Sequence, residues 1–250
     1  MVKLKGIFIS ARTSSTRLPN KALLDLCGKP TIQYLIDNLK NSVHADIIIL
    51  CTSALPEDKI LCEIAAASGI DFFQGSLEDK LHRWRGACEE FNVDFFVNVD
   101  GDDLFFDFGL ADLVFQQRNE EKIDFIDGWG LYNDVYGISY EALLKVCNDK
   151  ENNEIEYIRP YFLSNHSLAT QQLKNVPNKY IKKYRMTLDY KEDLDFFKTV
   201  IEGVVDSGKP LAFENIISFL EHNPTTKDIN FFLEEHWKKN QKKLYDIDHN

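Results

Sequence analysis

The first half of the chain alternates short apolar runs with stretches whose apolar residues recur at helical spacing. Four runs rich in Ile, Val and Phe are predicted to be buried strands, at 6–11, 45–51, 70–74 and 93–99. Helices are predicted between them, in a segment beginning at Pro30 and at 55–68 and 77–90. Continuous apolar strands alternating with helices indicate an α/β fold, a mostly parallel sheet with helices on both faces. In such sheets, ligands bind beyond the carboxyl ends of the strands.

The pattern changes after about residue 120. Short strand-like pieces at 122–140 are followed by a mainly helical stretch at 141–165, and an alternating segment at 184–189 predicts another strand. Residues 120–185 are therefore expected to form a small inserted lobe, which we expect to make dimer contacts.

Three helices are predicted to close the chain. The first has Leu194, Phe197, Ile201 and Val204 on one face, and the others lie near 213–222 and 227–239. We predict one domain over residues 1–240 and a polar tail at 241–250.

Composition narrows the class of protein. The 250 residues are 44% hydrophobic, which excludes wholesale disorder, and the net charge of -11 argues against a nucleic-acid binder. The sequence contains no apolar stretch of membrane-spanning length, and its first residues do not fit the pattern of a signal peptide, so we expect none. The five cysteines form no C-x-x-C pair, so we expect reduced thiols in a cytoplasmic protein.

Cations are concentrated in the loop after the first strand. Arg12, Arg17 and Lys21 lie within eleven positions, together with several hydroxyl residues. Arginine forks, a lysine and hydroxyls can form a cradle for phosphate oxygens, although a solvated basic loop would show the same charges. The sequence has no G-x-x-x-x-G-K-[ST], and no G-x-G-x-x-G follows the first strand, so a P-loop and a dinucleotide-binding domain are both disfavoured.

This loop resembles the opening motif of the cytidylyltransferase family, which includes the synthetases that couple CMP to sugar acids and the spore-coat polysaccharide cytidylyltransferases. The motif A-R-x-x-S-x-R-L-P-x-K is matched without departure, by Ala11, Arg12, Ser15, Arg17, Leu18, Pro19 and Lys21. Gly28-Lys29-Pro30 and Cys51-Thr52-Ser53 are also similar to family segments. The resemblance implies a Rossmann-like nucleotide-diphospho-sugar transferase fold. It also implies a set of nucleotide-binding residues: Ala11, Arg12, Ser15, Arg17, Lys21, Thr52, Ser53 and Asp79, the last from a G-S-x-x-D-x-L-x-R stretch.

Two acidic positions follow predicted strands. Asp102 comes after 93–99, and Asp189 ends 184–189; either one alone is typical of a turn or a helix cap. Their surroundings resemble the family's V-N-V-Q-G-D-E and T-x-D-x-x-E-D-L runs, which supply metal ligands. The resemblance therefore implies that Asp102 and Asp189 bind Mg²⁺, a cation that prefers oxygen ligands. Glu192-Asp193 is expected to cap the following helix.

Other positions depart from the family. Asp100 stands where relatives carry Gln or Thr, and Asp103-Leu104 where they carry Glu-Pro or Cys-Pro. Residues 127–141 match only at Gly137, so the identity of the acceptor does not carry over. A charged segment near the family's dimer and acceptor region contains Glu156, Tyr157 and Arg159.

The resemblance implies an enzyme that transfers CMP from CTP to an acidic or sugar-derived small-molecule acceptor with release of pyrophosphate. Arg12, Lys21 and Asp102 are the predicted catalytic residues, Mg²⁺ is the expected cofactor, and a homodimer without nucleic-acid or membrane partners is expected. Three alternatives stay open: a non-catalytic nucleotide-binding module of the same fold, another nucleoside triphosphate, and a phosphonate or phosphate acceptor.

Overall fold

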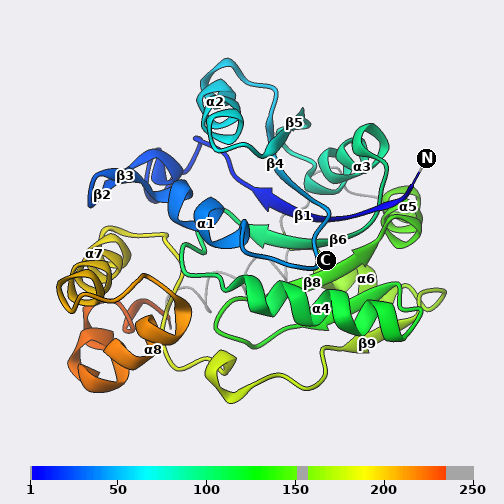
Figure 1. Ribbon diagram of the computed structural model, residues 1–250. Coiled ribbons are helices and arrows are strands. Elements are labelled where there is room, and N and C mark those ends of the chain that lie inside the picture. The colour runs from blue at the N-terminus through cyan, green and yellow to red at the C-terminus, as the bar shows by residue number, and fades with distance from the viewer. Residues whose placement is uncertain (1, 151–156, 235–250) are drawn as a thin grey trace.

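A seven-stranded sheet forms the centre of the structure, a computed structural model that describes residues 2–150 and 157–234 (Figure 1). Its strand order is β5-β4-β1-β6-β8-β7-β9. The strands span β1 Leu4–Ser10, β4 Ile47–Ser53, β5 Asp71–Gly75, β6 Val93–Asp100, β7 Phe125–Gly128, β8 Val135–Ser139 and β9 Thr170–Gln172. Two short strands, β2 Asp25–Leu26 and β3 Lys29–Pro30, form a separate antiparallel hairpin.

Strand direction determines which residues share an edge of the sheet. β5, β4, β1 and β6 are parallel, β8 runs antiparallel to β6, and β7 runs antiparallel to β8. Strands β4, β1, β6 and β7 therefore end, and β8 begins, at one edge, which we call the carboxyl edge. In the ladder, Ser10 of β1 lies opposite both Cys51 of β4 and Asp100 of β6.

Helices cover both faces of the sheet because residues within each strand alternate between two hydrophobic clusters. Ile7 and Ile9 of β1 pack with α1, α2, α4 and α7, whereas Phe8 packs with α3, α5 and α6. The helices span α1 Thr31–Leu39, α2 Lys59–Ala67, α3 Lys80–Phe91, α4 Phe108–Glu120, α5 Tyr140–Asp149, α6 Arg159–Ser164, α7 Lys191–Asp206 and α8 Phe213–His222. Short 3₁₀ helices span Lys21–Leu23, Pro56–Asp58, Asn178–Tyr180 and Pro224–Ile229.

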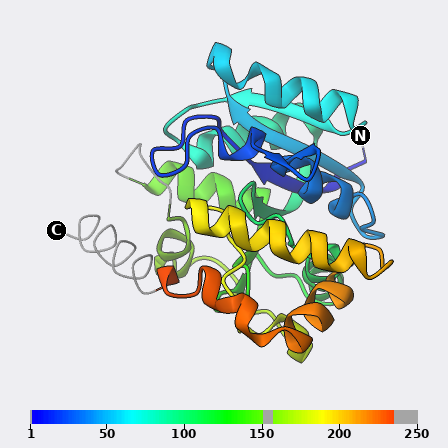
Figure 2. The same ribbon diagram turned by 90° about the vertical axis from the view of Figure 1, so that its left-hand side faces the viewer.

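Helices α7 and α8 pack against each other beside the β2–β3 hairpin and α1 (Figure 1). Figure 2 turns this side towards the viewer, with α7 in yellow lying above α8 in orange. Among the helices of the described ranges, none is both long enough and apolar enough to cross a membrane.

The α/β fold predicted from the apolar pattern is confirmed, and the strands and helices predicted before residue 100 are present within a few residues of their expected bounds. Residues predicted to form an inserted lobe contribute β7, β8 and β9 to the central sheet. Their role in a dimer stays a prediction. Glu156 and the polar tail lie outside the described residues.

One prediction about the second half is wrong. Residues 184–189 form no strand; a single backbone bond, from Leu188 N to the Asp102 carbonyl at 2.9 Å, joins this segment to the end of β6. After α8, the 3₁₀ helix Pro224–Ile229 precedes helical residues at 233–234, and the remainder of the helix expected near 227–239 lies outside the described residues. Helix α4 was not predicted, because it buries polar Asp112 and Gln117 beside its apolar residues and so lacks a clean polar face.

Candidate active site

The basic loop after β1 is anchored to β4 by a buried carboxylate. Asp58, fully buried before α2, accepts hydrogen bonds from the Thr13 backbone N at 2.7 Å and the Thr13 hydroxyl at 2.6 Å, and from the Ser53 hydroxyl. Burial alone would raise the pKa of Asp58, but the hydrogen bonds from Ser53 and Thr13 hold it below its usual value. Sequence reasoning missed Asp58, because an acidic residue at a helix start resembles an ordinary cap.

The loop also packs directly against the turn after β6. Ala11 is buried, and its backbone N donates to the Cys51 carbonyl at 3.3 Å. A Cβ at Gly101 would lie 2.8 Å from the Ala11 Cβ and 3.0 Å from the Ser10 carbonyl oxygen, so only glycine allows this approach. Thr52 and Ser53, both fully buried, end the neighbouring strand β4. The ends of β4, β1 and β6 are thus held together.

Lys21 brings the two predicted metal ligands together. Its ammonium contacts the Asp102 carboxylate and lies 3.0 Å from Asp189 Oδ1. Arg17 Nη2 reaches the same Asp189 oxygen at 2.5 Å. We call these four side chains the charge junction. They come from one loop and two other segments separated by more than 80 residues, and the structure places them at one point on the carboxyl edge.

The electrostatics of the charge junction follow from burial and from these contacts. Burial raises the pKa of Asp102, and the neighbouring Asp189 carboxylate adds to the effect against the opposing influence of Lys21. Burial also tends to raise the pKa of Asp189, but the positive charges of Lys21 and Arg17 outweigh burial and hold this pKa below its usual value. The two carboxylates in turn raise the pKa of Lys21 in spite of its burial. Lys21 therefore remains protonated, and its positive charge stabilises the two neighbouring carboxylates.

A buried arginine positions Asp189. Arg185 is 1% exposed; its Nη2 lies 3.2 Å from Asp189 Oδ2, and its Nε donates to Asp193 Oδ1 at 2.8 Å. Asp193 Oδ2 accepts from the backbone N of both Asp189 and Tyr190 at 2.9 Å, which confirms its expected capping role at α7. Asn230 adds bonds to the Arg185 carbonyl and to Asp193. Side chains, not a strand ladder, hold this segment in place.

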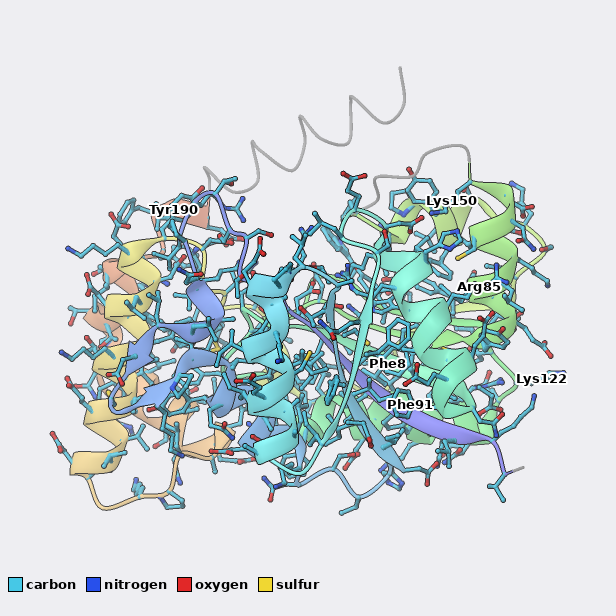
Figure 3. The ribbon with its side chains drawn as sticks, turned by 90° about the horizontal axis from the view of Figure 1, so that it is seen from above. Phe8, Arg85, Phe91, Lys122, Lys150 and Tyr190 are labelled. Carbon is cyan, nitrogen blue, oxygen red and sulfur yellow. The ribbon has the colours of Figure 1, made fainter. Side chains whose placement is uncertain are left out.

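Tyr190, labelled in Figure 3, lies at the start of α7 and contacts Arg17 of the charge junction. The guanidinium groups of Arg17 and Arg185 lie 5.7 and 5.8 Å from the centre of its ring. These distances permit cation–π contacts, which help to orient both arginines.

The other predicted nucleotide-binding residues are more widely spread. Arg12 Nη1 donates to the Leu77 carbonyl at 2.8 Å, which directs it towards the start of α3. The Ser15 hydroxyl accepts from the backbone N of Leu18 at 3.4 Å.

Asp79 acts as a helix cap in the structure. It accepts from the backbone N of His82 at 3.0 Å and forms an ion pair with Lys150. Lys150 lies far from Tyr190 in Figure 3. The predicted part of Asp79 in nucleotide binding stays a prediction.

The donor set at the charge junction fits Mg²⁺. Within residues 2–150 and 157–234, no group of three or more His, Cys, Asp or Glu side chains is arranged to hold a metal. Two carboxylates are nevertheless sufficient for Mg²⁺, which commonly takes one or two from the protein and completes its shell with substrate phosphates and water. Asp102 and Asp189 already converge on one cationic group, the Lys21 ammonium.

Comparison with known proteins identifies the family. A profile described as cytidylyltransferase matches residues 7–238. The chain belongs to the cytidylyltransferase family. This cytidylyltransferase is 31% identical over 241 residues to the uncharacterized protein MJ1063 of Methanocaldococcus jannaschii, covering 92% of this chain and 95% of the relative. It is 25% identical over 225 residues to the spore coat polysaccharide biosynthesis protein SpsF of Bacillus subtilis, covering 86% and 93%.

Solved structures confirm the fold. A cytidylyltransferase from Leptospira borgpetersenii superposes with a TM-score of 0.78 at 23% identity, covering 90% of this chain and 97% of its own. CMP:2-keto-3-deoxy-manno-octonic acid synthetase, solved in complex with CTP, superposes with a TM-score of 0.60 at 14% identity, covering 80% and 98%. The expected Rossmann-like nucleotidyltransferase fold is therefore present, and family membership makes the protein a CTP-dependent nucleotidyltransferase.

Proposed function

We propose that this cytidylyltransferase transfers CMP from CTP to an acidic or sugar-derived acceptor and releases pyrophosphate, for surface polysaccharide or related biosynthesis. The supporting observation is the charge junction, where the Lys21 ammonium contacts both Asp102 and Asp189. A cation between two converging carboxylates, beside a second cation, suits a metal–triphosphate complex. The name of the relative SpsF supports the polysaccharide context.

The reaction requires charge stabilisation more than covalent help. An acceptor oxygen attacks the α-phosphorus, its bond to phosphorus forms, the bridging bond to the β-phosphate breaks, and pyrophosphate leaves. Arg17 and Lys21 would turn from the carboxylates to the phosphate oxygens and neutralise the leaving pyrophosphate. Asp102 and Asp189 would hold Mg²⁺, which when bound supplies further positive charge at the reacting phosphate.

The remaining site residues would bind the nucleoside or keep the loop after β1 in its observed conformation. The backbone at Ala11 and the side chains of Thr52 and Ser53, at the ends of β1 and β4, would line the cytosine pocket. Arg12 lies beyond them towards α3 and would contact the phosphates. Asp58 would keep the loop closed against β4, because it accepts hydrogen bonds from both Thr13 and Ser53.

The test is pyrophosphate release from CTP and Mg²⁺ with a panel of sugar acids, neutral sugars, phosphates and phosphonates, read together with product mass. We expect a CMP adduct with at least one acceptor. Direct binding of CTP, UTP, GTP and ATP tests the nucleotide, and CTP should bind at least tenfold more tightly than the others. CTP affinity no better than that of the other nucleotides, together with no release in the panel, would contradict the proposal.

A further inference from the structure

The carboxyl edge continues past the charge junction onto β8 and β7. Phe95 pairs with Ser139 and Asn98 with Tyr136, and this register, continued by two residues, places Asp134 opposite Asp100. The β7–β8 register, which pairs Gly128 with Val135, likewise places Trp129 opposite Asp134. Neighbouring strands lie about 4.8 Å apart, so the turn that carries Trp129 begins about 10 Å from β6.

Asp134 links the end of β6 with the turn that carries Trp129. Asp134 Oδ1 accepts from the backbone N of Gly130 at 2.9 Å, which ties it to the turn that carries Trp129. Burial raises the pKa of Asp134 to about 6, and the carboxylates of Asp100 and Asp127 add to the effect. Asp134 therefore lies within electrostatic range of both β6 and β7. We call the surface that runs from Asp100, near the charge junction, through Asp134 to Trp129 the acceptor row.

Trp129 is an exposed aromatic side chain that is held in place by its neighbours and can serve as a flat platform. Its side chain is 40% exposed, with the Arg159 guanidinium 5.2 Å from its ring centre and the Tyr157 ring edge-on at 5.9 Å. Its backbone N donates to Asp127 Oδ1 at 3.1 Å. A rigid indole offers a flat apolar surface at low entropic cost, which suits the C–H face of a sugar ring.

The cations near the acceptor row are already paired. Arg159 binds the buried Asp127 with two nitrogens, at 3.0 Å from Nε and 2.9 Å from Nη2 to the same oxygen. Lys80 Nζ lies 2.5 Å from Asp100 Oδ1. Lys182, which acts on Asp134 at longer range, is paired with Glu234 at 2.7 Å. Each of these three cations is matched by a carboxylate, and Asp134 adds a further one, so the row carries no net positive charge that would attract an acceptor carboxylate or phosphate.

A buried carboxyl group beside the row lacks a donor. Asp103 is only 7% exposed, and its side chain accepts no hydrogen bond from any residue in the described ranges. Its electrostatic neighbours are Asp102, Asp100 and Asp134, which places it between the charge junction and the acceptor row. The oxygens of Asp103 are not among the fully buried side-chain atoms that lack a partner, so they remain open to a hydroxyl donated by a ligand.

We propose that the acceptor is an uncharged sugar or polyol, whose ring lies on Trp129 and whose hydroxyls donate to Asp134 and Asp103. The proposal rests on the proposed function and deepens it by choosing among its acceptors. One acceptor hydroxyl oxygen forms the new bond to the α-phosphorus, the bond to the β-phosphate oxygen breaks, and the hydroxyl proton passes to solvent. The excess of carboxylates along the row repels sugar acids and sugar phosphates.

The first test compares neutral hexoses, N-acetylhexosamines and pentitols with the matching uronic acids and sugar phosphates, using CTP, Mg²⁺ and pyrophosphate release. We expect a neutral acceptor with a kcat/KM at least tenfold above that of its anionic counterpart. Preference for an anionic acceptor, or no release with any neutral one while CTP still binds, overturns the inference and leaves CTP use intact. Loss of CTP binding to the parent protein would instead contradict the proposed function.

Substitutions at Trp129 and Asp134 test the aromatic platform and the carboxylate charge separately. Trp129→Ala should raise the KM for the neutral acceptor about tenfold with the KM for CTP unchanged, and Trp129→Phe should restore most of the loss. Phe72→Ala, a matched control that removes another aromatic side chain 40% exposed, on edge strand β5, should change neither constant. Asp134→Asn keeps the oxygen that accepts from Gly130 and should reduce discrimination against the uronic acid. Equal acceptor KM values for the parent and Trp129→Ala would overturn the role of the platform.

Discussion

The charge junction predicts an exchange between Lys21 and a metal ion. Lys21→Met keeps much of the side-chain volume and removes the ammonium, leaving Asp102 and Asp189 facing each other without the cation that bridges them. Breaking a buried ion pair costs about 3–5 kcal/mol, and Arg17 still contacts Asp189, so we expect a loss near 3 kcal/mol. In a protein of this size that lowers the melting temperature by about 6–12 °C.

Mg²⁺ should reverse part of this loss, because a divalent cation can then bind between the two carboxylates. At ten times its dissociation constant, a bound ion adds about 1.4 kcal/mol. The parent protein, whose Lys21 already contacts both carboxylates, should gain less from Mg²⁺ in the absence of CTP. Thermal unfolding of both proteins in EDTA and in Mg²⁺ measures the difference.

Lys29→Met is the matched control, since Lys29 pairs with Asp37 at the surface, where the side chains are 52% and 43% exposed. Its stability should change by less than about 1 kcal/mol, with or without Mg²⁺. Equal stability of Lys21→Met and the parent in EDTA, or equal stabilisation of both by Mg²⁺, would refute an exchange between Lys21 and the metal.

Two further predictions concern buried charges. Arg185→Met should lower the free energy of unfolding in urea by about 3–5 kcal/mol, since it leaves Asp189 and Asp193 without their shared partner. The control Arg85→Met breaks only a surface pair with Glu89 and should cost under about 1 kcal/mol. Similar losses of stability in the two variants would contradict the role of Arg185 in holding the two carboxylates. The pKa of Asp134 is raised from 3.8 to about 6 in the fold, so its contribution to stability is greatest below pH 3.8, declines as the pH rises to about 6 and is constant above. Relative to the parent, Asp134→Asn should therefore gain stability between pH 4 and 6, and a pH-independent difference would be inconsistent with the burial of this carboxyl.

The parts of the site that could be predicted from the sequence are those contained in one continuous segment. The loop from Ala11 to Lys21 follows an unmistakably buried strand, so its place at the end of that strand required no long-range information. The pairing of Asp102 with Asp189 was different: 87 positions separate them. Only the family resemblance suggested it, and no periodicity or spacing could have done so.

Residues 184–189 show why the rest could not be predicted. Tyr184, Met186 and Leu188 alternate with polar residues as in a half-buried strand, but Arg185 is buried as well and bonds to Asp193. Side-chain ion pairs therefore replace the backbone ladder that the alternation indicated. Asp58 was missed for a related reason, since its partners Thr13 and Ser53 lie on other elements.

Asp102 and Asp189 are proposed to bind the metal that accompanies CTP. The most direct measurement is the CTP dissociation constant in Mg²⁺ and in EDTA, for the parent protein, Asp102→Asn and the exposed control Asp206→Asn at the end of α7. We expect Mg²⁺ to tighten CTP binding at least tenfold in the parent and the control. In Asp102→Asn, Mg²⁺ should have little effect, and binding in EDTA should be unchanged or tighter because one repelling carboxylate is gone. An equal Mg²⁺ effect in all three proteins would contradict this metal-binding role.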